Sequence, residues 1–128
     1  ALSRGMTRGG LRYVVLTNPR ERAVVATSAG DVTLMRNTSW LVPNWLLGGS
    51  TPKSEGHVRA LREALGVTLV LTLTEEEPLP QTWFGGGTRN FFAPVPNTLP
   101  PVSMEQAHGI IAELEGEAAA GGRALVHC

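Results

Sequence analysis

Cys128 is the single cysteine of the chain, and it directly follows His127. A cysteine attacks electrophiles as its thiolate, so a reactive cysteine needs surroundings that lower the thiol pKa. The apolar run at residues 124–128, entered from Gly121 and Gly122, is typical of a buried strand that ends on this thiol. In open sheets with helical crossovers, ligands bind beyond the carboxyl ends of the strands. Cys128 is therefore expected either to act as a nucleophile or to be a buried, inert thiol.

Further motifs precede this pair in a defined order. They lie at residues 37–43 with Leu47-Gly48 after them, at residues 65–67 followed by 71–75, at residues 95–101, and at residues 123–128. With His127-Cys128, they resemble the cysteine-dependent protein phosphatases, in particular the small atypical dual-specificity phosphatases. The similarity runs from about Trp40 to Cys128. The family's signature continues beyond the nucleophile, with an Arg after five further residues.

This resemblance implies an α/β fold, a central mixed sheet flanked by helices, of which the chain is the N-terminal portion. It implies phosphoester hydrolysis, as a protein phosphatase acting on tyrosine and/or serine/threonine. Cys128 would attack phosphorus and form a phosphocysteine intermediate, and an Arg beyond the chain would clamp the phosphate. His127 would help to bind substrate by positioning the sulfur rather than act as a base. No metal or other cofactor is implied, and the partner would be a phosphorylated protein or a small phosphoester.

Asn97 occupies the place where the family has an aspartate that serves as the general acid. An amide cannot donate a proton to the leaving oxygen, and a positioned general acid is typically worth about 10²–10⁴-fold in rate. The protein could then be a weak catalyst, use another acid among Glu75, Glu76 and Glu77, or act on substrates with good leaving groups. The glutamates could equally form a solvated loop, and Asn97 a turn. The alternative function is a weak or inactive phosphatase-like module that binds phosphorylated partners.

The composition of the chain bears on its partners and its cellular compartment. Eleven basic and eleven acidic residues cancel, which favours neither nucleic acid nor a membrane surface as partner. One cysteine excludes an internal disulfide, and the longest apolar stretch, residues 67–73, is too short to span a bilayer. We therefore expect an intracellular protein, cytoplasmic or nuclear. His57 and His108 have no second ligand at metal-binding spacing, so no metal site is predicted.

A boundary between two regions of the chain is expected near residue 40. Residues 1–39 form an extension with a β-hairpin built from residues 13–16 and 23–26, and residues 40–128 form the phosphatase-like domain, incomplete at its C-terminus. Residues 1–40 hold six arginines against Glu21 and Asp31. Such a basic extension is either solvated or in contact with an anionic partner.

Hydrophobic spacing predicts the elements of the second region. A strand at residues 40–47 is interrupted or confined to an edge by Pro43, and a helix at residues 55–65 starts at Ser54, ends at Gly66 and pairs Arg59 with Glu63.

The other predicted elements follow in order. A central strand covers residues 67–73, another strand covers residues 88–93, and Ser103 with Gln106 forms a capping box for a second helix. That helix should bury a stripe of apolar side chains and keep its glutamates mainly off the stripe. The stripe consists of Ala107, Ile110, Ile111 and Leu114, and the glutamates are Glu113, Glu115 and Glu117.

Overall fold

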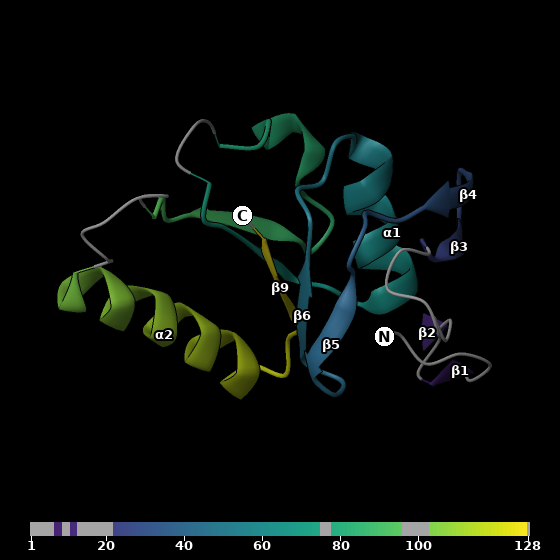
Figure 1. Ribbon diagram of the computed structural model, residues 1–128. Helices are drawn as coiled ribbons and strands as arrows, with labels where there is room; N and C mark the ends of the chain where they lie inside the picture. The colour runs from purple at the N-terminus through teal and green to yellow at the C-terminus, as the bar shows by residue number, and fades with distance from the viewer. Residues whose placement is uncertain (1–6, 9–10, 13–21, 75–77, 96–102, 128) are drawn as a thin grey trace.

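A five-stranded sheet forms the centre of the protein in the computed structural model, which describes residues 7–8, 11–12, 22–74, 78–95 and 103–127 (Figure 1). The strand order is β5-β6-β9-β7-β8, with β5 (Ser39–Val42) antiparallel to β6 (Leu46–Gly49). The other neighbours, β6, β9 (Ala124–His127), β7 (Leu69–Thr72) and β8 (Arg89–Phe92), are parallel. The mixed α/β sheet expected from the sequence is confirmed.

Two helices cover the two faces of this sheet (Figure 1). Helix α1 (Glu55–Leu65) connects β6 to β7, and α2 (Met104–Ala119) connects β8 to β9. Both connections cross over a strand position, so β9 lies between β6 and β7. The strand that carries the predicted nucleophile at its end is therefore the central strand of the sheet, flanked by parallel neighbours on both sides.

Helix α1 forms where its sequence signals predicted it. Ser54 is its N-cap and accepts a hydrogen bond from the backbone of His57, and Gly66 ends the helix in a left-handed conformation at φ 69°. The apolar face packs into the main core with the facing strands. This core includes Leu61 and Leu65 of α1 together with Leu47, Val70 and Leu125 of the sheet.

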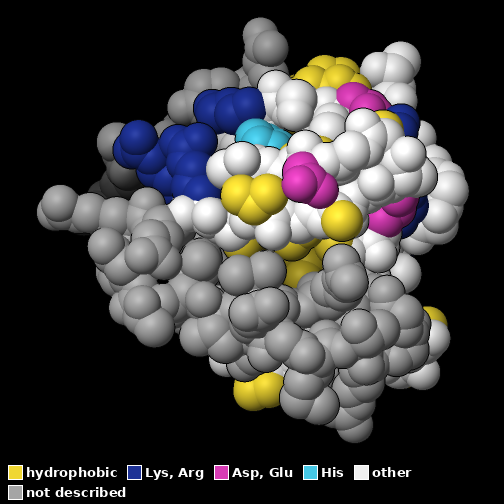
Figure 2. Space-filling view, turned by 90° about the vertical axis from the view of Figure 1, so that its right-hand side faces the viewer, with side chains coloured by type: hydrophobic (Ala, Val, Ile, Leu, Met, Phe, Trp, Pro, Cys, Tyr) yellow, Lys and Arg dark blue, Asp and Glu magenta, His cyan; other side chains and the backbone are white. Residues whose placement is uncertain are grey.

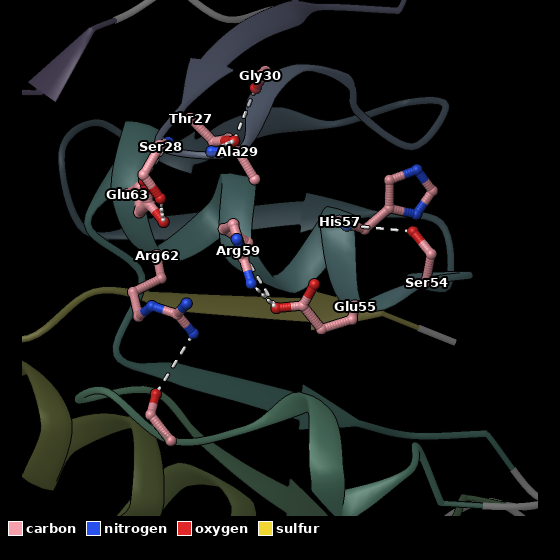
Figure 3. A network of polar contacts seen from close by, with 11 residues as sticks. Thr27, Ser28, Ala29, Gly30, Ser54, Glu55, His57, Arg59, Arg62 and Glu63 are labelled. Atoms are coloured by element: carbon pink, nitrogen blue, oxygen red, sulfur yellow. Dashed lines mark hydrogen bonds and ion pairs between the residues drawn. The ribbon is translucent and has the colours of Figure 1, made fainter.

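The ion pair predicted on α1 is wrong. Arg59 pairs with Glu55, one turn back, at 2.8 Å. Glu63 instead accepts two hydrogen bonds from Ser28, through the backbone nitrogen at 2.7 Å and the hydroxyl at 2.9 Å (Figure 3). Helical spacing allowed either partner for Arg59, and the tertiary contact with Ser28 draws Glu63 away.

A small hairpin lies beside α1 (Figure 1). It pairs β3 (Val24–Thr27) with β4 (Gly30–Thr33) in antiparallel register, and Val25 enters the core that α1 shares. The turn of this hairpin falls at Ser28-Ala29. The expected partner strand at residues 13–16 lies outside the described residues. Short strands β1 (Thr7–Arg8) and β2 (Leu11–Arg12) pair with each other, and η1 (Gln81–Trp83) precedes β8.

Helix α2 packs more loosely than its apolar stripe predicted. Its N-cap is Ser103, as expected, but no residue of α2 is fully buried and Ile111 is 49% exposed. The helix is turned so that two glutamates reach the sheet: Arg89 of β8 contacts Glu113 at 3.0 Å and Glu117 at 2.8 Å. Of the predicted stripe, Ala107, Ile110 and Leu114 are half-buried and Ile111 faces solvent. Within the described residues, no helix has the length and apolar character needed to cross a bilayer.

Candidate active site

The carboxyl ends of three strands meet at the point where the sequence placed its chemistry. Gly49 of β6 and Thr72 of β7 are both in register with His127, the last residue of β9. His127 is only 2% exposed. Its neighbour Cys128 lies outside the described residues, as do Asn97 and Glu75, Glu76 and Glu77. Of the predicted site residues, the structure therefore places His127, at the ligand-facing edge of the central strand.

His127 belongs to a hydrogen-bond network that spans three strands. Its Nε2 lies 2.8 Å from the hydroxyl of Thr72, and the side-chain amide of Asn90 on β8 donates to the same hydroxyl at 2.8 Å. The Asn90 nitrogen also donates to the carbonyl of Val70 at 2.9 Å, which settles the orientation of this amide because a carbonyl can only accept. Gln81 donates to the Asn90 side-chain oxygen at 3.3 Å.

The network uses one of the two ring nitrogens of His127. The Thr72 hydroxyl, which accepts from Asn90, shares a hydrogen bond with Nε2, and which of the two atoms donates depends on the tautomer of the imidazole. The other nitrogen, Nδ1, is buried and has no hydrogen-bond partner among the described residues.

His127 is neutral at physiological pH. Burial first, and then the positive charge of Lys53, lower its pKa to about 4. The imidazole therefore supplies a hydrogen-bonding ring nitrogen and no positive charge. Lys53 lies between β6 and α1 in the chain.

Sequence reasoning missed the residues that hold His127. Thr72 and Asn90 carry no recognisable motif, and Asn90 lies 37 positions before His127 on a different strand. The single available signal was Thr72 itself, a hydroxyl in an otherwise apolar strand predicted to be buried on both faces. A buried hydroxyl needs a partner, and that requirement alone pointed to a polar neighbour.

Comparison with known proteins now decides the family. The family model described as "Swiss Army Knife protein, DSP-PTPase phosphatase domain" (PTP-SAK) matches residues 35–128, from just before β5 to the residue after β9. The protein belongs to the PTP-SAK family. The resemblance to dual-specificity phosphatases that the sequence motifs indicated is confirmed at this level.

A solved structure supports the fold of this PTP-SAK domain. A crystal structure of a single-residue variant of human DUSP28 is similar with a TM-score of 0.52 and 24% sequence identity, over 70% of this chain and 57% of that chain. At this identity the similarity shows the fold alone, and the chain spans little more than half of the DUSP28 chain. A search among curated proteins finds no match.

The described edge of the PTP-SAK domain offers a neutral, oriented imidazole at the end of β9, with the charge of Lys53 acting on it. Across the described residues, no three histidine, cysteine, aspartate or glutamate side chains gather in a way that could hold a metal ion. An edge of this kind can position a nucleophile and attract an anion.

Proposed function

We propose that the protein is a phosphoester hydrolase of the dual-specificity type, which uses Cys128 as its nucleophile and forms a phosphocysteine intermediate. Its substrates are phosphorylated proteins, at tyrosine and/or serine/threonine, or small phosphoesters. The observation that supports this most is the position of His127 at the carboxyl end of the central strand, in a domain of a phosphatase family. Cys128 is the next residue along the chain.

The proposed reaction has two steps. The Cys128 thiolate attacks phosphorus, a sulfur–phosphorus bond forms, and the bond from phosphorus to the ester oxygen breaks as that oxygen takes up a proton. Water then attacks the phosphocysteine, which releases phosphate and restores the thiol. Because His127 is neutral, it stabilises the thiolate by position and hydrogen bonding and not by charge. The positive environment that lowers the thiol pKa must come from cations and backbone N–H groups.

Asn97 bears on the first step. With an amide at the general-acid position, the leaving oxygen must take its proton from water or from another acid. Aryl phosphates and phosphoanhydrides tolerate this loss because their leaving groups are stable as anions. We therefore propose that the protein prefers substrates with good leaving groups. The same residue supports the alternative, a module that binds phosphorylated partners and turns them over slowly or not at all.

Hydrolysis assays with the full-length protein test the proposal. The unmodified protein should hydrolyse p-nitrophenyl phosphate, and Cys128→Ser should abolish the activity. Asn97→Asp should raise the rate on an alkyl phosphate by about ten-fold or more, up to the 10⁴-fold worth of a general acid. The matched control is Asn44→Asp in the β5–β6 turn, at the opposite end of β6 from the candidate site, which should leave both rates unchanged.

The outcomes separate the two functions. Full activity after Cys128→Ser would refute the nucleophile assignment. A protein that hydrolyses neither substrate, yet binds a phosphopeptide with micromolar affinity, would favour the binding module instead. No hydrolysis and no binding would exclude both.

A further inference from the structure

The polar network at the end of the sheet is buried and holds no charged group. Asn90 of β8 contacts Thr72 of β7, which contacts His127 of β9, and the exposed fractions of Thr72 and His127 are 0% and 2%. Among the described residues, no charged side chain makes a hydrogen bond to any of the three. By contrast, lysine and arginine side chains gather beside a histidine at the molecular surface in Figure 2. The network therefore acts through the directions of its hydrogen bonds.

The side-chain amide of Asn90 is held in one orientation. Its nitrogen donates to the carbonyl of Val70 at 2.9 Å and to the hydroxyl of Thr72 at 2.8 Å. Its oxygen accepts from the side-chain nitrogen of Gln81 at 3.3 Å. Because a carbonyl only accepts, the nitrogen and the oxygen of this amide cannot be exchanged. Asn90 therefore presents a donor, and never an acceptor, to Thr72.

The direction of the next hydrogen bond follows from the single proton of the Thr72 hydroxyl. This hydroxyl accepts from Asn90, and Nε2 of His127 is its other hydrogen-bonding contact among the described residues, at 2.8 Å. If the hydroxyl donates to Nε2, its proton is used and the imidazole proton lies on Nδ1. If Nε2–H donates instead, the hydroxyl proton finds no acceptor among those residues and the lone pair of Nδ1 finds no donor.

The first of these arrangements leaves fewer buried polar groups unsatisfied. Among the described residues it leaves Nδ1–H alone without a partner, whereas the second leaves both the Thr72 proton and the Nδ1 lone pair. Each unsatisfied polar group destabilises the arrangement that contains it, and bulk solvent does not reach Thr72 or His127 to compensate. The count favours the tautomer of His127 that carries its proton on Nδ1.

We infer that Asn90 is a positioning residue of the proposed reaction, which acts through the Thr72 hydroxyl to keep the imidazole proton of His127 on Nδ1. The inference rests on the proposed function, because His127 directly precedes the proposed nucleophile, Cys128. In this tautomer the imidazole offers a hydrogen-bond donor at the end of β9, and a donor favours the charged form of a thiol beside it. The other tautomer offers an acceptor there and favours the neutral thiol.

This effect is separable from the charges that act on His127. Burial, and then the charge of Lys53 on the segment after β6, lower the pKa of His127 to about 4, so the imidazole is neutral at neutral pH. The groups that reach it from β7 and β8, Thr72 and Asn90, do not ionise in this range. Replacing Asn90 by leucine, which is similar in size, removes hydrogen bonds and leaves every charge in place.

NMR of the full-length protein labelled with nitrogen-15 tests the tautomer directly. At neutral pH, the nitrogen chemical shifts of His127 should show a protonated Nδ1 and an unprotonated Nε2. A protonated Nε2 would overturn the inference, and this measurement needs neither a variant nor a substrate. In Asn90→Leu, the Thr72 hydroxyl is free to accept from Nε2–H, so the population of that tautomer should rise.

Alkylation by iodoacetamide measures the consequence for Cys128, since the thiolate is the form that reacts and the chain has one cysteine. In Asn90→Leu, the midpoint of the alkylation rate against pH should rise by about 0.5–1 pH unit, or roughly three- to ten-fold less thiolate below the midpoint. Hydrolysis should follow, with kcat/KM lowered below the midpoint and close to that of the unmodified protein above it.

Further variants test whether Asn90 acts through the hydroxyl. Thr72→Val should raise the alkylation midpoint as Asn90→Leu does, and Asn90→Leu/Thr72→Val should raise it no further than Thr72→Val alone. Thr72→Ser keeps the hydroxyl and should restore the midpoint of the unmodified protein. Additive shifts in the double variant would contradict a route through Thr72.

Thr88→Val is the matched control. Thr88 is buried, and its hydroxyl donates to the carbonyl of Val67 at 2.7 Å, at the opposite end of β7 and β8 from His127. This variant loses a buried hydroxyl, as Thr72→Val does, so it should lose stability without moving the alkylation midpoint. Thermal unfolding verifies that each variant is folded at the temperature of the assay.

The inference and the proposed function can fail separately. An unchanged midpoint in Asn90→Leu and Thr72→Val, or an equal shift in Thr88→Val, would reduce the network to a structural role and overturn the inference. A shifted midpoint together with no hydrolysis of p-nitrophenyl phosphate by the unmodified protein would support the network and refute the proposed catalysis. Hydrolysis with the same pH profile in Asn90→Leu and the unmodified protein would retain the catalysis and reject the role of Asn90.

Discussion

The hydroxyl of Thr72 lies 2.8 Å from Nε2 of His127, so the last residues of β7 and β9 are joined by their side chains as well as by the sheet. Asn90 extends the link to β8. The contact is buried, with Thr72 fully inaccessible and His127 nearly so. It holds the imidazole in one orientation directly before the predicted nucleophile. Rigid support of this kind is what a reactive group needs from its neighbours.

Removing the Thr72 hydroxyl should therefore destabilise the protein. In Thr72→Val, Nε2 of His127 loses its partner and the Asn90 amide loses one of its two acceptors. A buried polar group left without a partner costs about 1–3 kcal/mol, which should appear as a lower free energy of unfolding in urea. Thr72→Ser keeps the hydroxyl and is the control, with a smaller loss from the missing methyl group. Equal stability of Thr72→Val and the unmodified protein would contradict the network.

Stability should depend on pH through His127. The unfolded imidazole titrates near 6.5 and the folded one near 4, so between these values the unfolded chain binds a proton that the folded chain excludes. Stability is then fully present above about pH 6.5, falls as the pH drops toward 4, and loses about 3 kcal/mol from this group at 1.4 kcal/mol per pKa unit.

NMR titration of the imidazole signals tests this directly. The His127 signal should titrate near pH 4, and a midpoint near 6.5 would contradict its burial as a neutral group. Assignment matters because the pKa of His57 is also lowered, by burial first. In unfolding experiments, His127→Gln should flatten the difference in stability between pH 4 and 6.5, whereas His108→Gln, on the exposed side of α2, should leave it unchanged.

Two glycine substitutions should have opposite effects. A Cβ on Gly122 would collide with the Glu117 carboxylate and the Thr68 hydroxyl, which are hydrogen-bonded to each other at 2.5 Å where the chain enters β9. Gly122→Ala should therefore lose about 1–3 kcal/mol of unfolding free energy. A Cβ on Gly109, inside α2, meets nothing within 4 Å. Gly109→Ala should gain about 0.5–1 kcal/mol, because alanine favours a helix.

Thermal or urea unfolding tests whether Gly122→Ala lowers and Gly109→Ala raises the free energy of unfolding. A neutral Gly122→Ala would show that the entry to β9 can relax around a methyl group. A destabilising Gly109→Ala would show that this side of α2 is covered in solution.

Glu63 should slow the exchange of amide hydrogens with solvent in the β3–β4 turn. Its carboxylate accepts from the backbone and the hydroxyl of Ser28, and these two bonds lower its pKa. In Glu63→Gln, the amide hydrogen of Ser28 should exchange faster with solvent, because the charge that strengthens both bonds is gone. Glu115→Gln, on the exposed side of α2, is the matched control. An unchanged exchange rate at Ser28 would mean that the turn is stable without its contact to α1.

Local signals in the sequence predicted much of the framework. Ser54 and Gly66 delimit α1 as expected, since a side-chain cap and a left-handed glycine act within one turn of the helix. The apolar run of β7 is buried on both faces and β9 is largely buried, as the composition of each run indicated. The family was also predicted from the sequence, because the motifs between residue 37 and Cys128 occur in the same order as in the dual-specificity phosphatases.

Only the tertiary structure decided which side chains contact one another. Thr72 and His127 meet because β7 and β9 are paired in register at their ends, and Asn90, which is paired with Val70, reaches the same hydroxyl from β8. Helical spacing placed Glu63 opposite Arg59 and placed Ile111 in a buried stripe. In the structure Glu63 binds Ser28, and Ile111 is exposed while Glu113 and Glu117 contact Arg89. Periodicity reports which face a side chain occupies. The residue that it meets there depends on register and crossover, which a linear pattern does not contain.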